Sequence, residues 1–220
     1  EASWVQAALA RLETLSYKPP AGNPSAHLSG VPPDTDFAAG VREILARIAA
    51  GECYQANLSR ALTFTSASPP AVLFAQLPLA PYGAYLSLRD SVLMSESPEL
   101  FWRLSGGEVQ TRPIKGTAPL GQAAQLMADP CVAGSVQAHA RQVLTLPTLL
   151  HAVQRVDGRL RPGLDALDLM DATFPPGSVT GAPKVQAMAL IHALEPVPRG
   201  AYTGAIGAFI DGGDAEFSVA

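Results

Sequence analysis

A lysine in the middle of the chain has neighbours that could support covalent or proton-transfer chemistry. Lys115 follows a segment typical of a β-strand and is flanked by Pro113 and by Gly116-Thr117. A lysine beside glycine at a strand end can lie in a cleft, where partial burial lowers its pKa and frees a neutral amine as nucleophile or base. A solvated lysine in a turn is the alternative, and the local sequence on its own favours it.

A glutamate shortly before this lysine is a candidate acid. Glu99 ends the segment Ser95-Glu96-Ser97-Pro98-Glu99, in which proline fixes the backbone just before it. A carboxylic acid held near a lysine can protonate a leaving hydroxyl group. The simpler interpretation is a capping or exposed glutamate, and the local sequence favours that one as well.

A loop rich in glycine and hydroxyl groups is a candidate anion site. Residues 177–184, Gly-Ser-Val-Thr-Gly-Ala-Pro-Lys, run into a predicted helix. Helix N-termini present free backbone N–H groups, so the loop could hold a carboxylate or a phosphate. Pro183 separates glycine from lysine, which excludes the P-loop arrangement and triphosphate binding. The alternative is a capped turn without a ligand.

Two further polar residues have simple structural interpretations. His151 lies among leucine and valine residues of a segment, 136–156, that we expect to be helical. A lone histidine on an apolar helix is more often a core residue than a functional one. Tyr202 lies in a glycine-rich segment, 201–210, that we expect to be a strand. Glycines there let a ligand approach closely, although a tightly packed strand is the alternative.

The elements that position these residues mix helices and strands without a strict βαβ alternation, which predicts the α+β class. The helix after Pro183 should bury Val185, Met188, Ile191 and Leu194. Gly106-Gly107 should form a hairpin turn. Further helices are predicted at 4–15, 37–48, 122–127 and 164–170, and strands at 54–59, 84–88, 92–95, 100–104, 108–112 and 216–219.

Composition excludes several classes of protein. The chain has 220 residues, 48% of them hydrophobic, and a net charge of −4, so we expect a globular protein without a nucleic-acid partner. It contains no apolar run near the roughly 20 residues that span a bilayer, so we expect no membrane segment. Cys53 and Cys131 fit neither a disulfide framework nor zinc spacing, which favours free thiols and a cytoplasmic location.

The order of several segments resembles the chorismate-utilising enzyme family. This family includes anthranilate, aminodeoxychorismate, isochorismate and salicylate synthases. The resemblance implies an α+β fold with two packed antiparallel β-sheets flanked by helices and a chorismate site between them. The segments are GECYQANLSR (51–60), APYGAYL (80–86), SESPELF (95–101), RPIKGTAPLG (112–121), HAVQRVDGRL (151–160), FPPGSVTGAPKVQAM (174–188) and RGAYTGAIGAF (199–209).

The resemblance also implies roles for individual residues. Glu99 matches the family's general acid, and His151 matches the histidine near the displaced hydroxyl group. The positions that line the substrate site in the family correspond to Thr117, Ser178 and Tyr202.

One pair of positions separates the subfamilies. Aminodeoxychorismate synthases resemble this chain in carrying lysine at Lys115, where anthranilate synthases usually carry alanine. Isochorismate and salicylate synthases place a catalytic lysine at the position of Gln55. The resemblance therefore implies that Lys115 adds covalently to chorismate and that ammonia, from a glutamine amidotransferase subunit, gives 4-amino-4-deoxychorismate. Anthranilate synthase and a non-catalytic chorismate-binding relative are the alternatives.

The chain departs from the family pattern in two places. A family segment is absent near 130/131, and the sequence stops at Ala220, before a family arginine and a glutamate-rich helix. These segments carry the family's Mg²⁺ ligands, so the resemblance implies Mg²⁺ without assigning a ligand here. We therefore expect a remnant of an N-terminal region (1–17), a Pro/Gly-rich linker (18–36) and an incomplete chorismate-binding catalytic domain (37–220). The chain is then either the ordered part of a longer protein or a truncated relative.

Overall fold

The computed structural model describes residues 26–30, 34–78, 80–123, 140–146, 149–177 and 179–220. The predicted helix at 4–15, most of the one at 122–127, Cys131 and Ser178 lie outside these ranges. None of the helices within them is long and apolar enough to cross a membrane.

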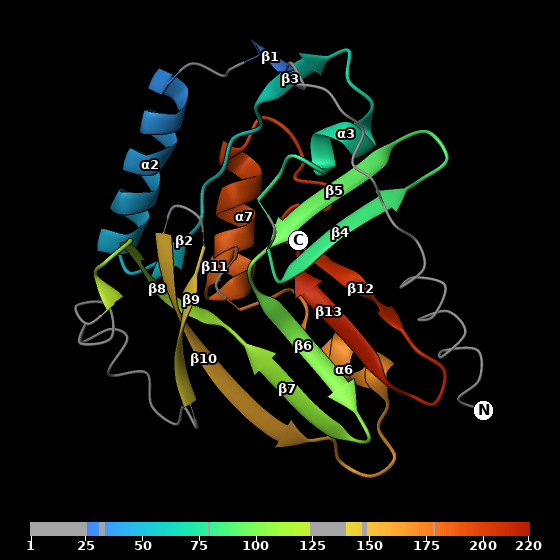
Figure 1. Ribbon diagram of the computed structural model, residues 1–220. Coiled ribbons are helices and arrows are strands. Elements are labelled where there is room, and N and C mark those ends of the chain that lie inside the picture. Colours follow the sequence, from blue (N-terminus) through green and yellow to red (C-terminus); the bar gives the residue numbers. More distant parts are fainter. Residues whose placement is uncertain (1–25, 31–33, 79, 124–139, 147–148, 178) are drawn as a thin grey trace.

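A seven-stranded antiparallel sheet forms the centre of the described molecule (Figure 1). Its strands are paired in the order β12 (Ala205–Phe209), β13 (Ala215–Val219), β6 (Leu100–Ser105), β7 (Glu108–Arg112), β10 (Leu149–Arg159) and β8 (Ile114–Pro119), and β9 (Ala140–Thr145) pairs with β10. The long strand β10 pairs with β7 through one half and with β8 and β9 through the other.

Three two-stranded ribbons and four helices complete the described fold. The ribbons are β1 (Ala26–Gly30) with β3 (Thr63–Ser66), β4 (Tyr82–Ser87) with β5 (Val92–Ser97), and β2 (Gln55–Ala56) with β11 (Gly181–Ala182). The helices are α2 (Asp34–Ala49), α3 (Pro70–Phe74), α6 (Ala166–Thr173) and α7 (Lys184–Leu194). Every strand pair is antiparallel, so the predicted α+β class is confirmed.

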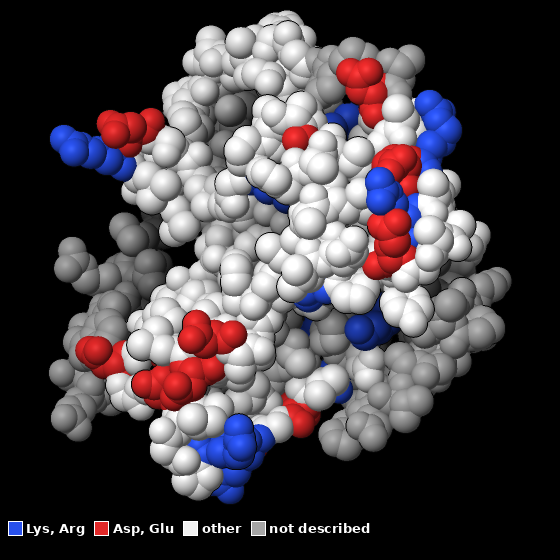
Figure 2. All heavy atoms as spheres, turned by 180° about the vertical axis from the view of Figure 1, so that it is seen from behind, with Lys and Arg blue, Asp and Glu red and all other residues white. Residues whose placement is uncertain are grey.

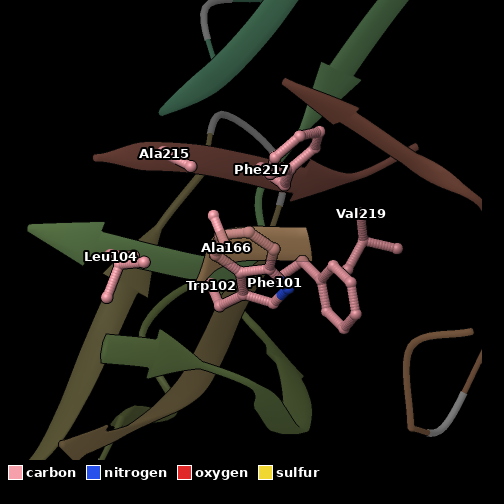
Figure 3. Close-up of a cluster of buried hydrophobic side chains, with 7 residues drawn as sticks. All are labelled: Phe101, Trp102, Leu104, Ala166, Ala215, Phe217 and Val219. Carbon is pink, nitrogen blue, oxygen red and sulfur yellow. The ribbon is translucent and has the colours of Figure 1, made fainter. Parts of the chain in front are cut away.

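The main core lies between one face of the large sheet and α6 (Figure 3). Trp102 is 2% exposed, and its ring centroid lies 4.9 Å from that of Phe217 on the neighbouring strand. Ala166, at the start of α6, packs against these rings. That helix begins where Asp165 and Asp168 form a reciprocal capping box, which fixes its start close to the predicted position.

Several local predictions are confirmed with small shifts. The helix at 37–48 is α2, and Ile44 on its apolar side is 5% exposed. Strands appear at each predicted position between 84 and 112. Gly106 and Gly107 both have positive φ angles and connect β6 to β7, as expected for a tight hairpin.

Other local predictions are wrong. The described parts of the predicted helix at 136–156 are strands β9 and β10, because each pairs along its length with neighbouring strands and tertiary pairing overrides local propensity. The strand at 54–59 is reduced to two residues, and the predicted linker contains β1. On α7, Ile191 is buried as predicted and Ala187 is buried as well, but Val185 is 84% and Met188 45% exposed, so the prediction is wrong for these two residues.

Charged side chains are dispersed over the surface. Figure 2, which views the molecule from behind, shows acidic and basic groups in small separate clusters among neutral residues. The described part of this face carries no continuous basic surface of the kind that binds a phosphate backbone.

Candidate active site

Lys115 is the extra residue of a β-bulge. Across from it on β10, Ala152 is opposite Gly116 and Val153 is opposite Ile114, so Lys115 has no partner in the ladder. A bulge bends the strand and redirects a side chain, and bulges are frequent beside functional sites. The Lys115 side chain is exposed, and it lines a cavity of about 340 Å³.

Glu99 lies on the same cavity, at the connection between β5 and β6. Its Oε1 accepts a hydrogen bond from the backbone N–H of Ile114 at 3.2 Å. Burial raises the pKa of Glu99, while the Ile114 N–H and the nearby positive charge of Lys115 lower it by less. The carboxyl group therefore keeps its proton to a higher pH than an ordinary glutamate, as a general acid requires.

Several elements form the remaining walls of this cavity, among them β6 with Leu100, Phe101 and Trp102, and β13 with Val219. Strand β7 contributes Val109 and Thr111, which alternate toward the same side as Pro113 and Lys115. Helix α6 contributes Leu169 and Thr173, and the loop after it contributes Pro176 and Gly177. The site is thus a concave space between the sheet and α6, with an amine and a protonatable carboxyl group on its wall.

His151 and Thr117 face each other on adjacent strands. They are opposite in the β8–β10 register, and Thr117 Oγ1 lies 2.9 Å from His151 Nδ1. Burial lowers the pKa of His151, and a hydrogen bond with the Gly116 backbone opposes this in part. The imidazole is therefore neutral at neutral pH, with one ring nitrogen donating and the other accepting. Our expectation of a helical His151 is wrong, because it lies in β10.

The structure does not place these two residues in the cavity of Lys115 and Glu99. Thr117 is two residues beyond Lys115 on the same strand, yet neither Thr117 nor His151 lines that space.

Tyr202 lies on a second cavity, of about 520 Å³, that Glu99 also lines. It lies in a turn before β12 and not in the predicted strand, because the chain reverses at Thr203, whose φ is 66°. The guanidinium group of Arg199 lies 5.8 Å from the centre of the tyrosine ring. Ser178, the remaining predicted substrate-binding residue, lies outside the described residues.

A buried ion pair, which sequence reasoning missed, ties the neighbouring loops together. The side chains of Arg199 and Glu195 are 12% and 6% exposed and form two hydrogen bonds, of 2.8 and 2.5 Å. Glu195 also accepts bonds from the backbone and hydroxyl of Ser59, and Arg199 donates to the carbonyl of Val179. The spacing of four residues between Glu195 and Arg199 could have suggested an ion pair, but it does not indicate that the two side chains are buried.

Lys184 was also missed as a structural residue. Its ammonium group donates to the carbonyls of Pro176 and Gly177 and to Thr180 Oγ1. This loop, which the sequence offered either as an anion site or as a capped turn, is held by hydrogen bonds within the protein itself.

Metal ligands are not gathered in the part of the chain that the structure describes. No group of three or more His, Cys, Asp or Glu side chains is close enough there to hold a metal ion. These residues therefore do not fit a Mg²⁺ site, which needs clustered oxygen ligands. The Mg²⁺ implied by the resemblance stays a prediction.

Comparison with known proteins places the chain in one enzyme family. A model of the family described as chorismate binding enzyme matches residues 1–129 and 123–220. Aminodeoxychorismate synthase component 1 of Salmonella typhimurium is 37% identical over 198 residues, which is 76% of this chain and 44% of that protein. Anthranilate synthase component 1 of Methanothermobacter thermautotrophicus is 34% identical, over 81% of this chain and 46% of that protein. The chain thus spans about half the length of the curated relatives that it matches.

Solved structures support the fold. Anthranilate synthase component I from Streptococcus pneumoniae superposes over 100% of this chain and 57% of its own, with a TM-score of 0.73 and 24% identity. A 2,3-dihydroxybenzoate-specific isochorismate synthase from Bacillus anthracis has the same TM-score over 90% of this chain and 63% of its own, at 23% identity. At this level of identity the likeness establishes the fold alone.

Proposed function

Because the chain belongs to the chorismate-binding enzyme family, we propose that it is the catalytic part of an enzyme that converts chorismate and ammonia to 4-amino-4-deoxychorismate. The observation that carries this proposal is the pairing of Lys115, on its β-bulge, with Glu99 on one cavity wall. Relatives named aminodeoxychorismate synthase component 1, from Salmonella typhimurium and Escherichia coli, are 37% and 35% identical to this chain.

In the proposed mechanism the reaction is divided into two substitutions. The amine of Lys115 adds to C2 of chorismate while Glu99 donates a proton to the C4 hydroxyl group, which leaves as water. Ammonia then attacks C4, the C2–nitrogen bond to lysine breaks, and a proton from the incoming nitrogen restores the acid. The sum is chorismate plus ammonia giving 4-amino-4-deoxychorismate plus water.

The pKa of Glu99 is the second support for this proposal. Because burial raises that pKa, the carboxyl group keeps its proton to a higher pH than an ordinary glutamate, and it can take a proton back after each cycle. We further propose that Thr117, His151 and Tyr202 contact the substrate, with neutral His151 hydrogen-bonded to Thr117. No step is derived through Mg²⁺, because the described residues form no site for it.

We propose that ammonia comes from a separate glutamine amidotransferase subunit. The designation component 1 in the names of the relatives supports this arrangement, since it implies a second component.

Anthranilate synthesis is the second candidate, favoured by the 34% identical archaeal relative. To separate the two, the full-length protein is incubated with chorismate, Mg²⁺ and ammonium, and aminodeoxychorismate lyase is then added. We expect p-aminobenzoate. Anthranilate fluorescence without p-aminobenzoate would reject the proposal in favour of the second candidate. Chorismate binding measured by calorimetry without turnover would indicate a non-catalytic relative.

A further inference from the structure

Lys184 occupies a position that ordinarily disfavours a cation. It is the first residue of α7, directly after Pro183. The N-terminus of a helix carries partial positive charge, so a lysine there is repelled instead of stabilised. Burial adds a cost, since it lowers the pKa of the Lys184 ammonium. A cation at this place needs compensating acceptors.

Those acceptors all come from the loop that precedes the helix. The ammonium donates to the Pro176 carbonyl at 2.7 Å, to Thr180 Oγ1 at 2.9 Å and to the Gly177 carbonyl. An ammonium group has three N–H donors and no acceptor. Each donor of Lys184 therefore has a partner within the protein, which leaves none for a substrate carboxylate.

The loop that Lys184 holds is a wall of the Lys115 cavity. Pro176 and Gly177 line that cavity together with Lys115 and Glu99, whereas Lys184 does not. The carbonyl groups of Pro176 and Gly177 accept hydrogen bonds from the Lys184 ammonium, which is not among the residues that line the cavity. Arg199 supports the same loop from a second direction, through the carbonyl of Val179 at 3.2 Å.

We propose that Lys184 is a positioning residue, which fixes the backbone at Pro176 and Gly177 against the cavity of Lys115 and Glu99 and does not itself bind the substrate. This inference rests on the proposed function. Its consequence is that loss of the ammonium lowers the rate of the covalent step more than it weakens binding, because small displacements of the groups around a reacting centre reduce turnover strongly.

The test compares variants of the full-length protein. Lys184→Met removes all three donors and keeps an apolar stem of similar length. Lys184→Gln keeps two N–H donors on a shorter side chain. Arg42→Met, which removes an exposed cation from α2, is the matched control for loss of charge.

Two measurements on these variants decide the proposal. In Lys184→Met we expect amide hydrogen exchange at Gly177 and in residues 179–182 to accelerate about tenfold or more, with β6 unchanged. We also expect kcat to fall about 10- to 100-fold while KM changes less than about threefold. Lys184→Gln should lie between Lys184→Met and wild type and provides the result if Lys184→Met does not fold. Arg42→Met should match wild type.

Several outcomes would overturn the proposal. Unchanged exchange in the loop would show that Lys184 does not fix it. Faster exchange with normal turnover would show that the loop position does not matter to the reaction. A rise in KM with normal kcat would assign Lys184 to direct substrate binding. If wild type forms no aminodeoxychorismate, the proposed function fails, while the exchange measurement still decides whether Lys184 holds the wall.

Discussion

The carboxylate of Glu99 accepts a hydrogen bond from the backbone N–H of Ile114 at 3.2 Å, which ties the proposed acid to the residue immediately before the proposed nucleophile. The bulge at Lys115 begins at that same Ile114, where the register with β10 shifts. The Glu99 side chain is therefore held against the backbone from which Lys115 projects, so the separation of the two reactive groups depends on the geometry of the bulge.

The first prediction concerns the nucleophile. Lys115→Ala should lower turnover by orders of magnitude, because the covalent route is lost. Lys115→Arg keeps the positive charge near Glu99 but cannot act as a neutral amine at accessible pH, so it should be equally inactive. Mass spectrometry of the wild-type protein with chorismate and no ammonia should detect an adduct of chorismate minus water on Lys115. Normal turnover of either variant would exclude lysine as the nucleophile.

The second prediction concerns the acid and its pH dependence. The pKa of Glu99 is raised, so its proton is retained above the ordinary carboxyl range and lost as pH rises further. Wild-type kcat/KM should therefore fall at the alkaline side as Glu99 ionises. Glu99→Gln should lower kcat by about 10²- to 10⁴-fold and remove that alkaline fall, because an amide does not titrate. An unchanged alkaline limb in this variant would assign the limb to another group.

The raised pKa of Glu99 also makes the stability of the fold depend on pH. A carboxyl group whose folded-state pKa is raised contributes stability below its unfolded pKa and loses it as pH rises through the folded pKa. Ionised Glu99 thus destabilises the fold at neutral pH. Glu99→Gln should unfold at a higher temperature than wild type at pH 7, and the difference should vanish near pH 4. A variant that is less stable at pH 7 would contradict the pKa direction.

Local sequence was enough to predict the central strands but not the bulge that positions Lys115. The segment 84–112 alternates apolar and polar residues and contains Gly106-Gly107, so its strands were predictable. The bulge at Lys115 was not, because a register shift is defined by a partner strand more than thirty residues away in the chain. That partner, β10, was itself predicted to be a helix, since its apolar run fits either period.

The functional residues depended on the family resemblance more than on local chemistry. Taken alone, Lys115 and Glu99 favoured solvent-exposed roles, and nothing local indicated a shared cavity. In the sequence, Lys184 and Arg199 were recognised only as charged residues within the family segments, without an indication of their partners. Several of their partners are backbone carbonyls, which carry no sequence signal, so these structural roles could be recognised only in the folded loops.

The third prediction concerns the pair on β8 and β10. Thr117→Val keeps the shape and β-branching of the side chain but removes the hydroxyl group that bonds His151 Nδ1. The loss of one hydrogen bond, about 1 kcal/mol, should lower kcat/KM about fivefold. Thr65→Val, on the exposed ribbon β3, is the control and should leave kcat/KM unchanged. A Thr117→Val protein with wild-type kinetics would remove this pair from the proposed substrate site.

The fourth prediction concerns the ion pair between Arg199 and Glu195. Glu195→Gln leaves a buried guanidinium without its counter-charge, so we expect the free energy of unfolding to fall by about 3–5 kcal/mol. The matched control is Glu216→Gln, which breaks the exposed pair with Arg103, whose side chain is 46% exposed. Exposed pairs contribute about 0–1 kcal/mol, so the control should change little. Urea unfolding monitored by tryptophan fluorescence measures both.

The pH dependence of this ion pair separates an electrostatic cause from a packing cause. Burial alone would raise the pKa of Glu195, but hydrogen bonds from Arg199 and Ser59 outweigh it and lower the pKa below the ordinary value of 4.5. A depressed carboxyl pKa contributes stability above the unfolded pKa that is lost as pH falls through the folded one. Wild type should therefore lose its advantage over Glu195→Gln below pH 4.5. A difference that persists unchanged to pH 2 would indicate that side-chain packing, and not charge, holds these loops together.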